Sequence, residues 1–407
     1  MKISFAGLLA LIFVSPIILS FCKSATPTFG DDLTFLKEFT KAFVLSDESG
    51  KKQVAVVPEY QGRVMTSTAD GEAGISFGWV NRDLIASGEK QPHINVYGGE
   101  DRFWLGPEGG QYSIFFKKGD PFDLDHWYTP SWIDTEPYDV VSQTQDRVTF
   151  SRKFQLMNYS GTQLDLEVIR EIRLLNDDDI ERELGLAMNL AYKSVAFETV
   201  NEIKNTGSNP WKKETGLLSI WILGMFNASP ETTIAIPFIE GDEKELGPIV
   251  NDTYFGKVPA KRLVVKEGVM FFAADANYRS KIGVLPSRSK PVMGSYDAVN
   301  RVLTVVQFTL PKGVTDYVNS MWEIQKEPYG GDAVNSYNDG PPEPGAAQLG
   351  KFYELETSSP ALALQPGQTG KHIHRTFHFQ GSESDLDSIA RKTLGVSIEE
   401  IKSALKK

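Results

Sequence analysis

The side chains best suited to binding a ligand gather in a glycine-rich segment, residues 93–113. Glycine pairs at 98–99 and 109–110 flank its polar and aromatic members, which are Glu100, Asp101, Arg102, Trp104 and Glu108. Glycine lets a backbone approach a ligand closely. Carboxylates and a guanidinium bind hydroxyl groups, and an indole ring packs against the apolar face of a sugar. The segment indicates a carbohydrate site, with a structural bulge and a core tryptophan as the alternative.

Further aromatic residues close in sequence could extend such a platform: Trp79, Trp127, Tyr128 and Trp132. A second polar segment, 327–345, shows neither strand nor helix periodicity and is predicted to be a long loop. Its oxygen donors are Asp332, Asn335, Asn338 and Asp339. Such donors can bind Ca²⁺ or sugar hydroxyls, but their spacing fits no EF-hand and Asx residues often cap turns. We predict that Asn335 and Asp339 contact the substrate and that no metal is bound.

Three of the five histidines lie at alternate positions of a predicted strand: His372, His374 and His378. Side chains alternate across a strand, so these imidazoles share one face. The spacing suits acid–base chemistry or a Zn²⁺ or Fe²⁺ site completed by Glu354, Glu356 or His126. It equally fits a half-buried strand whose imidazoles have polar partners. We take His374 as a candidate catalytic residue and His126 as a candidate substrate-binding residue.

Several other chemistries find no support in the sequence. There is no G-x-S-x-G elbow, P-loop, His-Glu-x-x-His or dinucleotide-binding fingerprint. The single cysteine, Cys22, lies too near the amino terminus to act as a catalytic nucleophile. A net charge of −11 argues against nucleic acid as a partner. The expected partner is a carbohydrate, with no cofactor.

The amino terminus has the pattern of a secretory signal peptide. Met1 and Lys2 precede an apolar run, residues 3–19, that is too short to span a membrane. Leu19-Ser-Phe-Cys22 resembles the bacterial lipobox, which predicts a signal peptide at 1–21 and a lipidated Cys22 on a tether at 22–30. Cleavage near Ser24 would instead release a free periplasmic protein. We expect export to the periplasm or outer membrane, with membrane contact only through the lipid.

The rest of the chain reads as mainly β. A helix is expected after Asp31-Asp32, and two more at 385–394 and after Ser397. Predicted strands lie at 148–156, 164–174, 195–204, 232–238, 262–273, 302–310, 352–357 and 372–379. Many strands with few helices between them exclude a parallel βαβ sheet. They predict a large all-β sandwich or barrel, formed as one domain over 31–407.

Two carboxy-terminal motifs resemble the galactose mutarotase (aldose 1-epimerase) superfamily: Phe352-Tyr-Glu-Leu-Glu-Thr, followed by a Leu-x-Pro-Gly turn, and His374-Arg-Thr-Phe-His-Phe. Gly98-Gly-Glu-Asp-Arg-Phe-Trp-Leu-Gly-Pro-Glu-Gly-Gly-Gln further resembles a family of bacterial envelope proteins placed in that superfamily. The resemblance implies a large twisted antiparallel β-sandwich whose concave face binds a sugar, with Glu356 as general base. The superfamily's acid histidine is missing from the corresponding stretch, residues 216–227.

These features favour an exported carbohydrate-active enzyme related to aldose epimerases. Glu356 would act as base, and the missing proton donor would be Glu108, His126 or His374. One alternative is a glycan-binding lipoprotein without catalysis. A second is a metal-dependent lyase or hydrolase that uses His372 and His374.

Overall fold

The computed structural model describes residues 27–187, 191–343 and 345–406. The predicted signal peptide, Cys22 and most of the predicted tether lie outside these residues. In the described part of the chain, no helix combines the length and the apolar character needed to cross a membrane.

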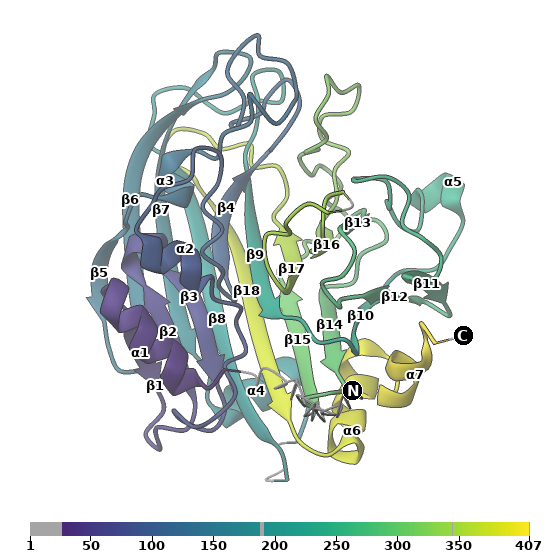
Figure 1. Ribbon diagram of the computed structural model, residues 1–407. Helices are drawn as coiled ribbons and strands as arrows, with labels where there is room; N and C mark the ends of the chain where they lie inside the picture. Colours follow the sequence, from purple (N-terminus) through teal and green to yellow (C-terminus); the bar gives the residue numbers. More distant parts are fainter. Residues whose placement is uncertain (1–26, 188–190, 344, 407) are drawn as a thin grey trace, which may run out of the picture.

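Two antiparallel sheets form the body of the molecule (Figure 1). The larger sheet has ten strands in the order β11-β12-β10-β14-β15-β18-β8-β7-β6-β5. Their bounds are β5 Asp139–Gln143, β6 Arg147–Met157, β7 Gln163–Leu174, β8 Lys193–Asn205, β10 Thr232–Pro237, β11 Leu263–Lys266, β12 Val269–Ala273, β14 Val292–Asp297, β15 Val302–Phe308 and β18 Thr369–Gln380.

The smaller sheet has five strands in the order β13-β16-β17-β9-β4. Its strands are β4 Arg102–Gly106, β9 Ser219–Asn227, β13 Ser280–Val284, β16 Val334–Asn338 and β17 Phe352–Ser358. A separate three-stranded sheet contains β1 Phe43–Ser46, β2 Gln53–Val57 and β3 Arg63–Thr68, and the short 3₁₀ helix η1 Pro58–Tyr60 joins β2 to β3.

The two large sheets pack through their apolar faces. Strand β7 shows the principle: residues from Leu164 to Leu174 alternate between buried and partly exposed, because neighbouring side chains of a strand point to opposite faces. In the smaller sheet Ile222 and Leu355 face the larger sheet and join its core. Burying such a side chain stabilises the fold by about 1.5–3 kcal/mol. The opposite face of the five-stranded sheet is therefore free to carry polar groups.

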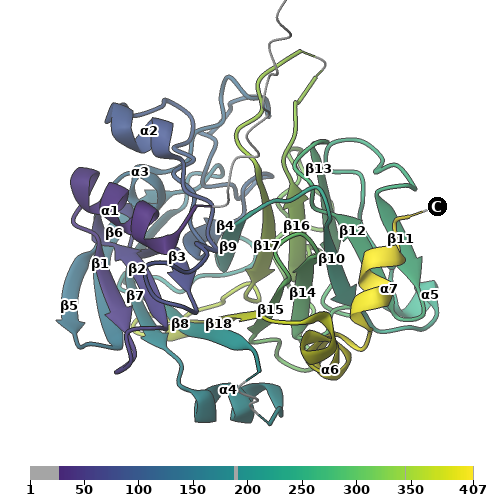
Figure 2. The same cartoon turned by 60° about the horizontal axis from the view of Figure 1, so that its bottom comes forward.

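Helices cover the remaining apolar surfaces. Helix α1 Phe29–Phe39 and helix α2 Arg82–Ser87 pack beside the three-stranded sheet (Figure 1). Helices α4 Asp177–Leu184, α6 Glu383–Leu394 and α7 Ile398–Ser403 cover the outer face of the ten-stranded sheet (Figure 2). Two single-turn helices, α3 Ser131–Asp134 and α5 Glu243–Leu246, lie in loops.

The structure confirms the mainly β class with large antiparallel sheets and terminal helices. Three local predictions were wrong. Helix α1 begins at Phe29, because Thr28 and Asp31 form its capping box. The run at 262–273 is a hairpin, since Glu267 and Gly268 adopt the positive φ values of a tight turn. The predicted loop at 327–345 contains strand β16, whose pairing with β13 and β17 outweighs its weak strand pattern.

Candidate functional site

One face of the five-stranded sheet carries charged and aromatic side chains. Cross-strand register places Glu356 beside Leu223 and Asn335, and Arg102 on the other side of Leu223. Trp104 and Trp221 are opposite each other on β4 and β9. Because side chains alternate along a strand, all of these point away from the ten-stranded sheet. These residues form one group with Glu354 and Lys281 on the same face and with the loop residues Glu108, Tyr254 and Trp322. We call this group the polar cluster.

Glu356 lies at the centre of the polar cluster and is fully buried. Its Oε2 accepts hydrogen bonds from Lys281 Nζ at 2.9 Å and from Trp221 Nε1 at 3.0 Å. The Lys281 ammonium also lies 4.8 Å from the centre of the Trp221 ring. Among the described residues, no partner donates a hydrogen bond to the other carboxylate oxygen, Oε1, which is also buried. The Glu354 carboxyl group lies within hydrogen-bonding reach of Glu356. Glu356 therefore has one oxygen fixed by two donors and a second acidic side chain beside it.

Glu354 lies on the same strand face and pairs with Arg102. Arg102 Nη2 donates to Glu354 Oε1 at 3.1 Å, and the guanidinium stands over the Trp104 ring at 4.3 Å. Trp104 packs edge-on against Trp221. Arg102 Nε, Arg102 Nη1 and Trp104 Nε1 are buried and have no hydrogen-bond partner in the described structure. Buried donors without acceptors are rare in folded proteins, so their concentration here indicates a binding site.

Loops complete the polar cluster on two sides. Glu108 follows β4 and accepts a hydrogen bond from Trp322 Nε1 at 3.2 Å, while Trp127 stacks on Trp322. On the other side, Tyr254 OH donates to Asp332 Oδ2 at 2.5 Å and accepts from Asn335 Nδ2 at 3.2 Å.

A glycine makes room for this second group. A Cβ atom at Gly283 would lie 2.0 Å from Asp332 Oδ2. Even alanine at this position would therefore collide with the Asp332 carboxylate, so the sheet carries glycine there.

The carboxyl groups of the polar cluster have unequal environments. Burial, opposed by Arg102 and reinforced by Glu356, raises the pKa of Glu354 to about 8. Burial also raises the pKa of Glu108, although the charge of Lys281 opposes this shift. Burial raises the pKa of Asp332 to about 6. The pKa of Lys281 is raised because the surrounding glutamates outweigh its burial. Glu354 therefore holds a proton at neutral pH, beside a charged lysine.

The structure brings together five of the residues predicted from sequence: Glu356, Glu108, Arg102, Trp104 and Asn335. Asp101 instead points between the sheets, where its Oδ1 pairs with Arg170 at 2.5 Å and its Oδ2 accepts from Thr199. Asp339 follows β16 and accepts hydrogen bonds from Tyr337 OH and Gly350 N.

The histidines lie elsewhere. His126 is in a loop and pairs with Asp123 at 2.6 Å. His372, His374 and His378 do share one face of β18, and that face is buried between the sheets. Thr357 Oγ1 lies 2.9 Å from His372 Nε2 and 2.9 Å from His374 Nδ1. Thr357 is on the opposite face of β17 from Glu356, so these imidazoles do not reach the polar cluster. The described residues contain no group of three or more His, Cys, Asp or Glu placed to hold a metal.

Sequence reasoning missed four members of the polar cluster: Trp221, Tyr254, Lys281 and Trp322. Lys281 lies in β13, a five-residue strand that the sequence pattern did not reveal. A single lysine before Ile282-Gly-Val284 was the available signal, since a charged residue within a short β run needs a partner. Trp221 gave no signal in the sequence, because its strand is apolar on both faces.

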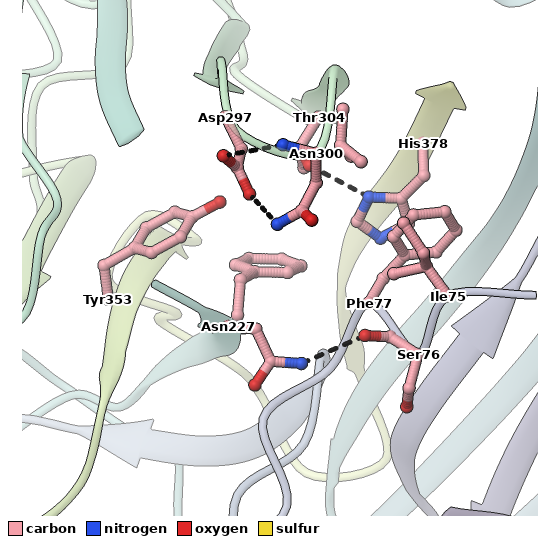
Figure 3. Close-up of a pocket in the computed structure, with 11 residues that line it drawn as sticks. Ile75, Ser76, Phe77, Asn227, Asp297, Asn300, Thr304, Tyr353 and His378 are labelled. Atoms are coloured by element: carbon pink, nitrogen blue, oxygen red, sulfur yellow. Dashed lines mark hydrogen bonds between the residues drawn. The ribbon is translucent and has the colours of Figure 1, made fainter. Parts of the chain in front are cut away.

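A small cavity between the sheets is lined by Ile75, Phe77, Asn227, Asp297, Thr304, Tyr353 and His378, among others (Figure 3). His378 binds Glu100 and Thr304 through its two ring nitrogens. Asp297 accepts from Asn300 and Ser229. These polar groups have protein partners, in contrast to the free donors of the polar cluster. We therefore take the polar cluster as the candidate site.

One protein-family model matches almost the whole chain. The family model DUF6786, described as a family of unknown function, matches residues 27–405, so the chain belongs to this family. Curated proteins give no match.

Several solved structures have a similar fold. A candidate aldose 1-epimerase from Escherichia coli is 12% identical, with 84% of this chain and 99% of that chain covered and a TM-score of 0.49. For the Slr1438 protein from Synechocystis the identity is 14%, the coverage 84% and 96%, and the TM-score 0.46. For a galactose mutarotase-like protein from Lactobacillus casei they are 10%, 83% and 99%, and 0.46.

Proposed function

We propose that the protein binds a sugar at the polar cluster and catalyses proton transfer on it, in the manner of an aldose epimerase. The observation that carries this proposal is the pair Glu354 and Glu356. The two glutamates share one strand face, about 7 Å apart along the chain. Glu354 is protonated at neutral pH because its pKa is about 8, and it lies within hydrogen-bonding reach of Glu356, whose Oε2 is held by Lys281 and Trp221. Neighbouring carboxyl groups with different environments can divide the roles of acid and base.

The aromatic side chains around the pair fit a sugar ring. Trp104 and Trp221 offer an indole face and edge, and Trp104 Nε1 is a free donor for a hydroxyl group. In the proposed reaction Glu356 removes the proton from the anomeric hydroxyl, and Glu354 donates its proton to the ring oxygen. The C1–O5 bond breaks and an open-chain aldehyde forms. Reclosure on the other face returns both protons and gives the other anomer, with no net oxidation.

The test is anomer interconversion, followed by polarimetry or nuclear magnetic resonance, with a panel of freshly dissolved aldoses and uronic acids. Glu356→Gln removes the base while preserving size. We expect turnover to fall by roughly 10²- to 10⁴-fold, the usual contribution of a general base, while sugar binding is retained. The control is Glu202→Gln, which removes a partly exposed glutamate paired with Lys371 on the other sheet. Unchanged turnover in Glu356→Gln would remove Glu356 from the mechanism.

Binding without turnover is a second candidate function. It is favoured by the contacts that engage both glutamates, which are the Lys281–Glu356 ion pair and the hydrogen bond from Arg102 to Glu354. Saturable binding of a sugar that the protein does not interconvert, with the same affinity in Glu356→Gln, would establish this function instead.

We also propose that the protein is exported and anchored through Cys22, on the strength of the basic start, apolar run and cysteine at its amino terminus. Metabolic labelling with a radioactive fatty acid in a bacterial host tests this. The label should appear in the wild-type chain and be lost in Cys22→Ser. A labelled Cys22→Ser chain, or an unlabelled wild type, would contradict it.

A further inference from the structure

Two buried arginines lie side by side at the edge of the polar cluster. Val64 on β3 pairs with Asp101 through an isolated antiparallel bridge. The residues flanking that bridge, Arg63 and Arg102, therefore project from the same side of the backbone. Arg63 is 1% exposed and Arg102 is 3% exposed. The pKa of Arg63 falls to about 9 through burial and the charge of Arg102, so the Arg63 guanidinium remains positive at neutral pH.

Nearby acidic groups do not balance these charges. Asp101 points to the opposite face, where it pairs with Arg170. Asp134 accepts hydrogen bonds from Asn95 and is close enough to Arg63 and Arg102 to interact with their charges, but it offsets at most one of the two. Glu354 touches Arg102 and is neutral at pH 7, as argued above. The positive charge at this end of the polar cluster therefore exceeds the negative charge.

The donors of both arginines are incompletely used. Arg63 donates to Gly98 O and Gln61 Oε1, and its Nε has no partner in the described structure. Arg102 has a single hydrogen bond, to Glu354, and its Nε and Nη1 are also without partners there. A buried cation left with free donors is costly unless an anion completes its environment. At the far end of the cluster, Lys281 is already paired with Glu356.

We propose that the sugar bound at the polar cluster carries an anionic substituent, a carboxylate or a sulfate ester, which Arg102 binds while Arg63 adds to the positive field. This inference rests on the proposed function and narrows its substrate class. A guanidinium matches both groups, because its planar donors hydrogen-bond to paired oxygens of a carboxylate or a sulfate. Trp104 supports the Arg102 guanidinium from below and holds it in place. The matching neutral sugar would leave these donors unpaired.

The test compares matched ligands on the full chain by titration calorimetry. The ligands are glucose and galactose, their uronic acids, and the corresponding 6-sulfates. A charge-assisted hydrogen bond is about twice as strong as a neutral one, so the anionic sugar should bind roughly 10- to 100-fold more tightly than its neutral parent. The substituent is identified by which sugar, the uronic acid or the 6-sulfate, shows the larger increase in affinity over its neutral parent. The preference should also weaken as salt rises from about 0.1 to about 1 M, because ions screen the attraction.

Substitutions test whether Arg102 causes the preference for the anionic sugar. Arg102→Gln should reduce the preference for the anionic sugar to near unity, and Arg102→Lys should retain part of it. Arg147→Gln, which removes a half-exposed arginine on β6, should leave the preference unchanged. If Arg102→Gln fails to fold, the ligand and salt comparisons on the wild type still decide. Equal affinities, or tighter binding of the neutral sugar, would overturn this inference and leave the proposed function standing. No binding of any sugar in the panel would contradict both.

Discussion

Two glutamates on one strand face, Glu354 and Glu356, set the chemistry available to the polar cluster. They differ because their partners differ. Arg102 engages Glu354 from β4, and Lys281 with Trp221 engages Glu356 from β13 and β9. Three strands distant in sequence thus determine the protonation of two residues on a fourth. A single substitution among these partners should change the acid–base properties without changing the carboxyl groups themselves.

The pH dependence of turnover follows from Glu354. Its pKa is raised to about 8, so it is protonated below that pH and can donate a proton. Turnover should therefore fall as pH rises through about 8, and Glu354→Gln should show low turnover without this limb. This fall is measured from initial rates of anomer interconversion between pH 6 and 10, after correction for the spontaneous reaction. Glu202→Gln should reproduce the wild-type profile, whereas a wild-type rate that is flat to pH 10 would exclude Glu354 as the acid.

At the residue scale the sequence predicted about half of the polar cluster. Trp104, Arg102 and Glu108 were found because a glycine-rich segment with mixed side chains is unusual. Asn335 and Glu356 came from a polar segment and from a family resemblance. Asp101 was named with its neighbour Arg102, yet the two point to opposite faces because they are adjacent on the chain. The sequence does not show which of two adjacent side chains faces the core until the register of the strand is known.

At the scale of the elements, one ion pair joins the two sheets. Asp101 just before β4 pairs with Arg170 on β7, and both side chains are fully buried. Arg170 Nε also donates to Gly62 O, next to β3. The pair therefore connects all three sheets close to Arg102 and fixes the strand that carries it.

Breaking this pair should destabilise the fold. Asp101→Ala leaves the Arg170 charge buried without its partner, which typically costs about 3–5 kcal/mol. Chemical denaturation followed by circular dichroism measures the free energy of unfolding. Asp139→Ala, on the exposed edge strand β5, should change it by less than about 0.5 kcal/mol. If the Asp101→Ala chain is as stable as the wild type and only sugar affinity falls, Asp101 acts in binding, as its sequence context suggested.

The elements themselves were predictable where local signals were strong. Helix α6 lies close to the range predicted for it, 385–394, because Ser382 caps its start and the left-handed Gly395 ends it. The short strands β13 and β16 were missed. Each has five residues, and β13 is stabilised mainly by pairing with β16, which in turn pairs with β17. Such strands depend on tertiary pairing, which a single sequence does not display.

At the scale of the whole molecule, the sandwich buries two neutral imidazoles. Burial lowers the pKa of His372 to about 3 and that of His374 to about 4. In the unfolded chain both return to about 6.5. Below that pH the unfolded state binds protons that the folded state cannot accept. The stability that these residues contribute is therefore complete above about pH 6.5 and is lost as the pH falls toward 3.

Proton uptake on unfolding tests this prediction. At pH 5.5, calorimetry in buffers of different ionisation enthalpy should show His374→Gln taking up nearly one proton fewer than the wild type. The control His126→Gln removes a histidine whose pKa is raised by Asp123, so it is protonated in both states at this pH. Equal uptake by wild type and His374→Gln would mean that His374 is already charged in the folded protein.

The outer edge of the ten-stranded sheet has a consequence for behaviour in concentrated solution. Strand β5 exposes Val140 and Val141, at 44% and 64%, beside backbone groups that another strand could pair with. Its register against β6 shifts between Val140 and Ser142, which inserts an extra residue and bends the edge. A bent edge is a poor template for a second chain. The irregularity thus disfavours strand-to-strand self-association and fibril growth at this exposed edge.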